Sequence, residues 1–265
     1  MPGTSDASED GSTSVDATTA DSAEDSSSGD DSGIPDGVIP GLSDEFDDAR
    51  TLSDWTRRHE AEGTEAGYST LDIDTSTAEH LTFVPTTGGW FGDFAGALLF
   101  KEVAGDFMVE TWVAAVNQDG SGAPPTMGYN SAGLLVRDPA SVPGAQNWVM
   151  HNVGFQDTIV ATEGKTTTNS ASILELIEGP HTGRLRICRI GEEILLTRRL
   201  DGEADFTETH RFTRSFPDTV QVGLTVNGWN STGSQPNFGR EPDLRAEFDY
   251  IRFFEVGSEA DCLAD

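Results

Sequence analysis

Apolar and polar residues alternate along most of the chain after residue 42, which is the pattern of β-strands with one buried face. Residues 106–117 form the longest stretch of this kind. One face would carry Phe107, Val109, Thr111 and Val113, and the other Met108, Glu110, Trp112 and Ala114. Because both faces are bulky, we predict that this strand lies in the middle of a sheet.

Shorter stretches of the same character follow at regular intervals, separated by residues that favour turns. The predicted strands are 67–74, 80–84, 96–103, 106–117, 131–137, 147–155, 158–168, 172–178, 183–190, 193–200, 209–214, 219–227 and 244–256. No stretch has the periodicity of an amphipathic helix. The sequence also contains no repeated unit of about 20–50 residues. We therefore predict an all-β fold, a jelly-roll β-sandwich of two curved antiparallel sheets. The expected core includes Leu185, Ile187, Val220, Val222, Leu224 and Val226.

Residues 131–155 combine two predicted strands with the most polar candidates for a ligand site. The first strand ends in a turn signal after Arg137, and the second carries Asn147 and His151 among apolar residues. If the two strands pair, we expect Arg137, Asn147 and His151 on one polar face with aromatic neighbours. This face is the predicted ligand-binding surface.

The first 41 residues differ in composition from the rest of the chain, because they contain no Lys, Arg or aromatic residue. Such a segment buries too little apolar surface to offset the entropy of ordering, so we predict a disordered acidic tail over 1–41. It would serve either as a tether to a cell surface or as a solubilising extension. The sandwich is predicted over 42–258, followed by a short tail at 259–265.

The formal net charge is −30, with 16 Lys and Arg residues against 46 Asp and Glu residues. Nucleic acids and anionic membrane surfaces would be repelled, so we expect neither as a partner. The sequence shows no apolar run long enough to cross a bilayer and no signal peptide. The lipoprotein-like tail nevertheless leads us to expect an extracellular or cell-surface protein.

The two cysteines, Cys188 and Cys262, are far apart in the sequence. A disulfide would form if the C-terminus folds back beside the strand that holds Cys188, and two separate thiols are the alternative. Zinc is not expected, because no Cys-x-x-Cys or Cys/His cluster occurs.

Several segments, taken in order, resemble the concanavalin A-like lectin/glucanase superfamily. They are Asp-Glu-Phe-Asp-Asp with its following Leu and Trp (44–55), the strand 107–113, Ala-Gly-Leu-Leu-Val-Arg (132–137), Asn-Trp-Val (147–149), Val-Gly-Leu (222–224) and Phe-Asp-Tyr-Ile-Arg-Phe (248–253). The chain is most similar to bacterial jelly-roll domains of unassigned function and to β-sandwich modules appended to family 43 glycosidases. The resemblance covers about residues 42–256 and implies a ligand on the concave face, carbohydrate in many relatives, and in many a structural calcium ion.

The resemblance does not extend to the catalytic motif of the glucanases in this superfamily. Those enzymes carry Glu-x-Asp-x-x-Glu, in which one glutamate is the nucleophile and the other the acid. Here, Glu175-Leu-Ile-Glu178 lacks the aspartate and places its two side chains on opposite faces of a strand. Glu247-Phe-Asp249 begins like the motif but ends at Arg252. We therefore predict no catalytic residues of this kind.

A sugar site would use indoles that stack on sugar rings, together with polar groups that bind hydroxyls. The predicted ligand-binding residues are Arg137, His151, Trp112, Glu110, Asn147 and Trp90, with Asn152 and Gln156 in support and Trp148 and Trp229 as further aromatic candidates. Packing within the sheets is the alternative for the strand tryptophans. A salt bridge with Glu110 or Asp138 is the alternative for Arg137.

Four carboxylates at the two ends of the sandwich sequence, Asp44, Asp47, Asp48 and Asp249, would meet if the first and last strands are neighbours. They would then offer the oxygen ligands of a structural calcium site, and a solvated acidic rim is the alternative. We expect no other cofactor.

Three functional hypotheses follow. We favour a non-catalytic carbohydrate-binding domain, lectin-like, of a secreted or surface-tethered protein. The second hypothesis is a glycoside hydrolase or polysaccharide lyase with a non-standard site built from Glu110, His151 and Arg137. The third is a structural or adhesion module whose sheet face binds another protein.

Overall fold

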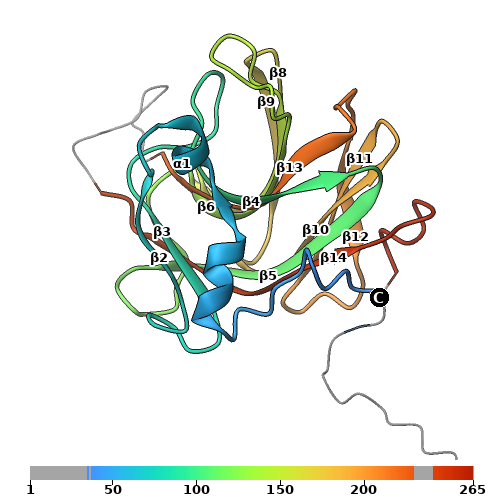
Figure 1. The fold of residues 1–265 in the computed structure, drawn as a ribbon. Helices are drawn as coiled ribbons and strands as arrows, with labels where there is room; N and C mark the ends of the chain where they lie inside the picture. Colours follow the sequence, from blue (N-terminus) through green and yellow to red (C-terminus); the bar gives the residue numbers. More distant parts are fainter. Residues whose placement is uncertain (1–34, 36, 230–240, 265) are drawn as a thin grey trace, which may run out of the picture. The chain divides into compact units, whose positions relative to one another are not determined.

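A computed structural model describes residues 35, 37–229 and 241–264, which belong to one compact unit, Pro35–Asp265 (Figure 1). The predicted tail at 1–41 lies mostly outside the described residues. The elements are η1 (Ala49–Asp54), β1 (Thr56–Arg57), α1 (Arg58–Glu62), β2 (Tyr68–Ile73), β3 (Leu81–Pro85), β4 (Ala97–Ala104), β5 (Phe107–Asn117), β6 (Asn130–Arg137), β7 (Trp148–Gln156), β8 (Ile159–Thr168), β9 (Ala171–Glu178), β10 (Thr182–Ile190), β11 (Glu193–Leu200), β12 (Thr207–Thr213), β13 (Thr219–Gly228) and β14 (Leu244–Phe254). No helix in this part of the chain is long and apolar enough to cross a membrane.

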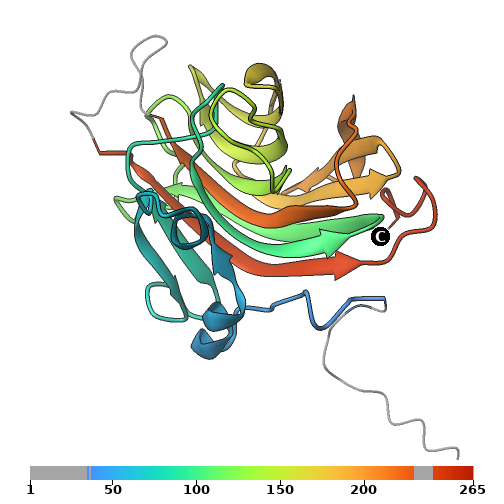
Figure 2. The same ribbon diagram turned by 45° about the horizontal axis from the view of Figure 1, so that its top comes forward.

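The strands form two antiparallel sheets, which confirms the predicted all-β sandwich. The front sheet has the order β1-β4-β13-β6-β7-β8-β9, and the back sheet has the order β12-β11-β10-β5-β14-β3-β2. Chain neighbours are often separated in space, as expected of a jelly roll. Figure 2 shows that the long strands bend along their length, so both sheets are curved.

The core lies between the inner faces of the two sheets. Every predicted core residue is buried there, including Leu185 and Ile187 of β10 and Val222 and Leu224 of β13. The strand β5 lies between β10 and β14, which confirms its predicted central position. Alternation along each strand therefore separates the residues of the inter-sheet core from those on the outer faces.

The pairing of β6 with β7 overturns one prediction. Arg137 is opposite Trp148, whereas His151 is opposite Leu134. Residues that are directly opposite in an antiparallel pair share a face, so Arg137 lies on the outer face of the front sheet and His151 on the inner face. The expectation that they form one polar surface is wrong, because a register that differs by one residue moves a side chain to the other face.

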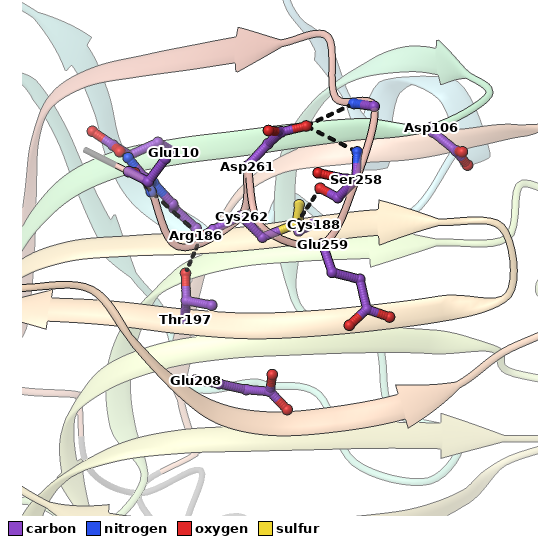
Figure 3. The surroundings of a disulfide bond; sticks show 12 residues. Asp106, Glu110, Arg186, Cys188, Thr197, Glu208, Ser258, Glu259, Asp261 and Cys262 are labelled. Carbon is purple, nitrogen blue, oxygen red and sulfur yellow. Dashed lines mark hydrogen bonds and ion pairs between the residues drawn. A yellow bond between two sulfur atoms is a disulfide. The ribbon is translucent and has the colours of Figure 1, made fainter.

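Residues on both sides of the predicted sandwich, 42–258, make contacts with its strands. Val38 forms an isolated bridge with Phe254, and the Ile39 amide donates to the Phe253 carbonyl at 2.8 Å. The C-terminal segment folds back over the outer face of the back sheet, where Cys262 forms a disulfide with Cys188 (Figure 3). The two Cα atoms are 5.9 Å apart and the residues are 74 positions apart in sequence. Of the two alternatives left by the sequence, the disulfide is therefore the one observed.

Removing this disulfide should lower the stability of the whole unit. We expect the double substitution Cys188→Ala/Cys262→Ala to reduce the free energy of unfolding by about 2–5 kcal/mol, because the cross-link restricts a long segment of the unfolded chain. Urea unfolding followed by tryptophan fluorescence measures the change. A reducing agent should reproduce the loss in the parent protein and leave the double variant unchanged. A loss below about 0.5 kcal/mol would show that the segment's packing alone is sufficient.

Candidate functional site

The middle of the front sheet's outer face is filled by a tryptophan from the loop that precedes β4. Trp90 packs on Phe100, Leu135, Trp148 and Met150, and 1% of its surface is exposed. Its indole N–H donates to Thr225 Oγ1 at 2.7 Å, and its ring meets that of Trp148 edge-on at 5.6 Å. The sequence predicted Trp90 at the rim of an open binding face. In the structure, Trp90 is buried and fills the centre of that face.

A glycine permits this arrangement. A Cβ atom at Gly96 would lie 2.8 Å from the Trp90 Nε1 atom, so a larger residue would displace the indole. The loop can therefore fold down on the sheet only because position 96 has no side chain.

Beyond Trp90, the same face carries a row of buried polar side chains on β6, β7 and β8. Lys165 pairs with Glu163 at 2.6 Å and donates to the Trp90 carbonyl at 3.1 Å. Gln156 donates to Glu163 at 3.0 Å, and Asn152 donates to Ser131 at 3.2 Å. The sequence proposed Asn152 and Gln156 as supporting positions, but it did not reveal the Lys165–Glu163 pair, because the two are adjacent to no motif.

A pocket of about 680 Å³ opens beside the Trp90 loop. Its walls come from α1 and the turn that follows it, from the loop 87–96 and from the loop 139–146. The polar and aromatic side chains that line it and matter for binding are Arg58, Glu62, Glu65, Asp93, Phe94 and Gln146. None of these residues was a predicted site residue, because three loops distant in sequence build the pocket.

Arg137 links two walls of the pocket, α1 and the loop 139–146, from the side that faces away from the pocket. It is 1% exposed, and its guanidinium donates to Glu62 at 2.5 Å, to Gln221 at 2.9 Å and to the Ser141 carbonyl at 2.9 Å. Burial lowers the pKa of Arg137, and the Glu62 carboxylate opposes that effect. Arg137 therefore positions α1 and the loop 139–146 and does not itself line the pocket.

A second arginine fixes α1 to the Trp90 loop. Arg58 donates from Nε to the Gly96 carbonyl at 2.8 Å, from Nη2 to the Ala95 carbonyl at 3.1 Å and from Nη1 to Glu62 at 2.6 Å. Both oxygens of Glu62 are thus held by arginines. The helix ends at Gly63, which adopts φ = 66° and so reverses the chain toward the pocket.

The other pocket residues differ in how much of their hydrogen-bonding capacity is used. Asp93 accepts from the Gly144 amide and the Ser170 hydroxyl, and these bonds lower its pKa. Gln146 is 3% exposed, and its Oε1 atom has no hydrogen-bond partner among the described residues. The Phe94 ring is 46% exposed, and it rests edge-on against Trp229 with ring centroids 4.9 Å apart.

Glu110 and Trp112 lie on the outer face of the back sheet, on the opposite side of the sandwich from the pocket. Glu110 pairs with Arg186 at 2.6 Å and accepts a hydrogen bond from Tyr250. Burial and this carboxylate raise the pKa of Tyr250. The C-terminal segment contacts the pair, because Arg186 also donates to the Cys262 and Ala264 carbonyls, and Figure 3 shows Arg186 beside Cys262. The structure therefore does not bring Glu110 and Trp112 together with Arg137, because β5 and β6 belong to different sheets.

The remaining predicted residues have local structural contacts. His151 is fully buried between the sheets, with Nδ1 3.1 Å from the Arg186 carbonyl. Asn147 precedes β7, and its amide donates to the Ala145 carbonyl at 3.0 Å. Trp229 is 8% exposed and packs under Phe94 instead of facing solvent.

The proposed calcium ligands are engaged elsewhere or dispersed. Asp44 accepts from the Phe46 amide at 3.0 Å and from the Trp55 indole at 2.8 Å, while Asp48 pairs with Arg50. Asp47 and Asp249 are exposed. Within the described part of the chain, no three His, Cys, Asp or Glu side chains lie close enough together to hold a metal ion.

Comparison with solved structures supports the fold. No family model and no curated protein sequence matches the chain. A GH43 protein BlXynB mutant from Bacillus licheniformis has a TM-score of 0.58 at 11% identity, covering 82% of this chain and 40% of that one. A legume lectin-like domain from Entamoeba histolytica has a TM-score of 0.52 at 9% identity, and the match covers 83% of this chain and 99% of that domain. A functionally unknown protein from Saccharomyces cerevisiae has a TM-score of 0.54 at 16% identity, and the match covers 78% of this chain and 99% of that protein.

These similarities agree with the predicted fold, a sandwich of two antiparallel β-sheets. At such low identity they show the fold alone. The chain spans about two fifths of the length of the GH43 protein.

The burial of His151 has a measurable consequence. Burial lowers the pKa of His151 from 6.5 to about 3, so the folded protein keeps this imidazole neutral where the unfolded chain protonates it. Stability should therefore fall as the pH drops from about 6.5 toward 3, with this group contributing up to about 1.4 kcal/mol per pH unit. We expect His151→Gln to flatten the slope, as measured by urea unfolding across this range.

Part of the slope should remain in that variant, because burial also lowers the pKa of His210. Near-ultraviolet circular dichroism checks that the variant keeps its native packing. Identical slopes in the parent and in His151→Gln would contradict the assignment of a neutral buried imidazole.

Proposed function

We propose that this domain is a non-catalytic carbohydrate-binding module and that the glycan occupies the pocket between α1 and the loops 87–96 and 139–146. The observation that carries the proposal is an exposed aromatic ring, Phe94, at a pocket lined by fixed polar groups. A volume of about 680 Å³ is in the range of pockets that hold small ligands, and here it accommodates a few sugar units. The fold is one in which glycosidase-associated and lectin-like structures are found.

The chemistry of the lining suits sugars. A phenyl ring offers an apolar surface to the C–H face of a pyranose, while side-chain oxygens accept hydrogen bonds from hydroxyls. Phe94 supplies the ring, and Gln146 and Asp93 supply oxygens, of which that of Asp93 is held in place by the Gly144 amide and the Ser170 hydroxyl. Such preorganisation lowers the entropic cost of binding.

Binding is better supported than hydrolysis. A glycosidase needs one carboxyl group that is protonated and able to donate to the leaving oxygen. Both Glu62 oxygens already accept hydrogen bonds from arginines, and the two donors to Asp93 lower the pKa of Asp93, which favours its carboxylate over the acid. The alternative enzyme site of Glu110, His151 and Arg137 has no geometric support, since these residues lie on three different faces.

The proposal also concerns the setting of the domain. A disulfide is typical of proteins outside the reducing cytosol, which supports an extracellular or cell-surface location. The acidic segment 1–41 would then act as the tether. We propose no metal for sugar binding, so a chelator should leave the affinity unchanged.

The Phe94 ring should contribute most of the apolar contact with the sugar. We expect Phe94→Ala to weaken binding at least tenfold, about 1.4 kcal/mol, because the stacking surface is lost. Isothermal titration against soluble xylan, mixed-linkage β-glucan and chitosan measures the change.

Phe91→Ala is the matched control. Phe91 lies in the same loop with 45% of its surface exposed, against 46% for Phe94, but it does not line the pocket. Its removal should change the affinity less than twofold. If none of these polysaccharides binds while a host-surface protein does, the adhesion hypothesis replaces this proposal.

A further inference from the structure

The pocket lining is unbalanced in charge. Among the residues that the structure describes, it contains the carboxylates of Glu62, Glu65 and Asp93 but one guanidinium, that of Arg58. Three of the five Arg58 N–H groups already donate to the protein, to Gly96, Ala95 and Glu62, and Arg58 is buried. Among the described lining residues, a negatively charged ligand would therefore meet three carboxylates and a single cation, which is buried and already bound to Glu62.

Two of the carboxylates have capacity left for a ligand. Glu65 is exposed at the turn after α1, and no hydrogen bond or ion pair within the described part of the chain engages it. Asp93 receives its two hydrogen bonds at Oδ1, from Gly144 and Ser170. Its second oxygen can accept from a ligand.

A buried amide in the same lining also requires a donor. Gln146 is 97% buried, and its Oε1 atom has no partner among the described residues. A buried acceptor without a partner costs free energy unless a ligand or water satisfies it. Gln146 lies in the loop 139–146, which the Arg137 contact with Ser141 holds in place. This acceptor is independent of the carboxylates, and a ligand with N–H or O–H donors would satisfy it.

We infer that the pocket prefers cationic amino sugars, with unacetylated hexosamine units as the bound group, and that it excludes uronic acids. This inference rests on the proposed function and specifies its ligand. The ammonium group would lie near Glu65 and Asp93, and the ring hydroxyls would donate to Gln146. The chain's net charge of −30 acts in the same direction, because it attracts cations and repels polyanions over a distance.

The test compares oligosaccharides that differ mainly in charge. Glucosamine tetramer, N-acetylglucosamine tetramer, cellotetraose and galacturonic acid tetramer are titrated into the full chain by calorimetry, at a pH where the amine is protonated. We expect the glucosamine tetramer to bind about tenfold more tightly than its acetylated counterpart, since it gains two partly exposed charge contacts. The preference should shrink at about 1 M salt, where the Debye length is about 3 Å and exposed charge pairs are strongly screened. It should also shrink at a pH where the amine is neutral.

Two variants that remove the same charge distinguish the effect of the pocket carboxylate from attraction by the protein's net charge. Glu65→Gln should reduce the preference for the glucosamine tetramer about threefold. Glu255→Gln removes the same charge from an exposed position outside the pocket lining and should have little effect. Equal effects of the two variants would show attraction by net charge alone, and would overturn the assignment to this pocket.

The outcomes distinguish failure of the amino-sugar inference from failure of the proposed function. If glucosamine and N-acetylglucosamine tetramers bind equally and Phe94→Ala weakens both, the amino-sugar inference fails while the proposed function stands. Tightest binding of the galacturonic acid tetramer would likewise overturn the charge preference alone. If no oligosaccharide binds, both proposals fail.

Discussion

The packing of Trp90 onto the front sheet determines where a ligand can bind. The outer face of a curved sheet would otherwise present Trp148 and Met150 to solvent, and burying an aromatic side chain of this size over them is strongly favourable. Gly96 leaves room for the indole, and Thr225 satisfies its N–H. Because the centre of the face is occupied, the available space lies at its margin, on the other side of the loop that carries Trp90.

The wall of that space depends on buried charge. A helix of five residues has almost no stability of its own, so α1 must be held by tertiary contacts. Arg58 and Arg137 hold it through Glu62, and each also binds backbone carbonyls of a neighbouring loop. Removing one member of such a network leaves the others buried without a partner, which costs more than the lost bond. The residues that shape the pocket are therefore distinct from those that would contact the ligand.

The sequence was sufficient for the fold but not for the site. Alternation along each strand correctly assigned core residues such as Val222 and Leu224, since burial repeats every second residue. It could not fix the register between β6 and β7, because the connecting loop is long enough for either register. In the observed register, Arg137 and His151 lie on opposite faces of the sheet. Nor could it say that β5 and β6 belong to different sheets, which separated Glu110 from both. The pocket escaped prediction because its walls come from three loops, whose relative positions depend on tertiary contacts and have no periodicity.

The distribution of charge links stability to the proposed ligand. The whole chain has 16 Lys and Arg residues, and among those that the structure describes, seven are buried: Arg58, Arg137, Lys165, Arg186, Arg189, Arg198 and Arg214. They bind carboxylates and carbonyls inside the domain, as the Arg186–Glu110 pair does beneath the disulfide-linked segment. Cations used as internal contacts are withdrawn from the surface, so the exterior is more acidic than the net charge alone suggests. Because Arg58 pairs with Glu62, it does not neutralise Glu65 or Asp93, and the same arrangement that stabilises α1 would set the sign of charge of the ligand that we propose.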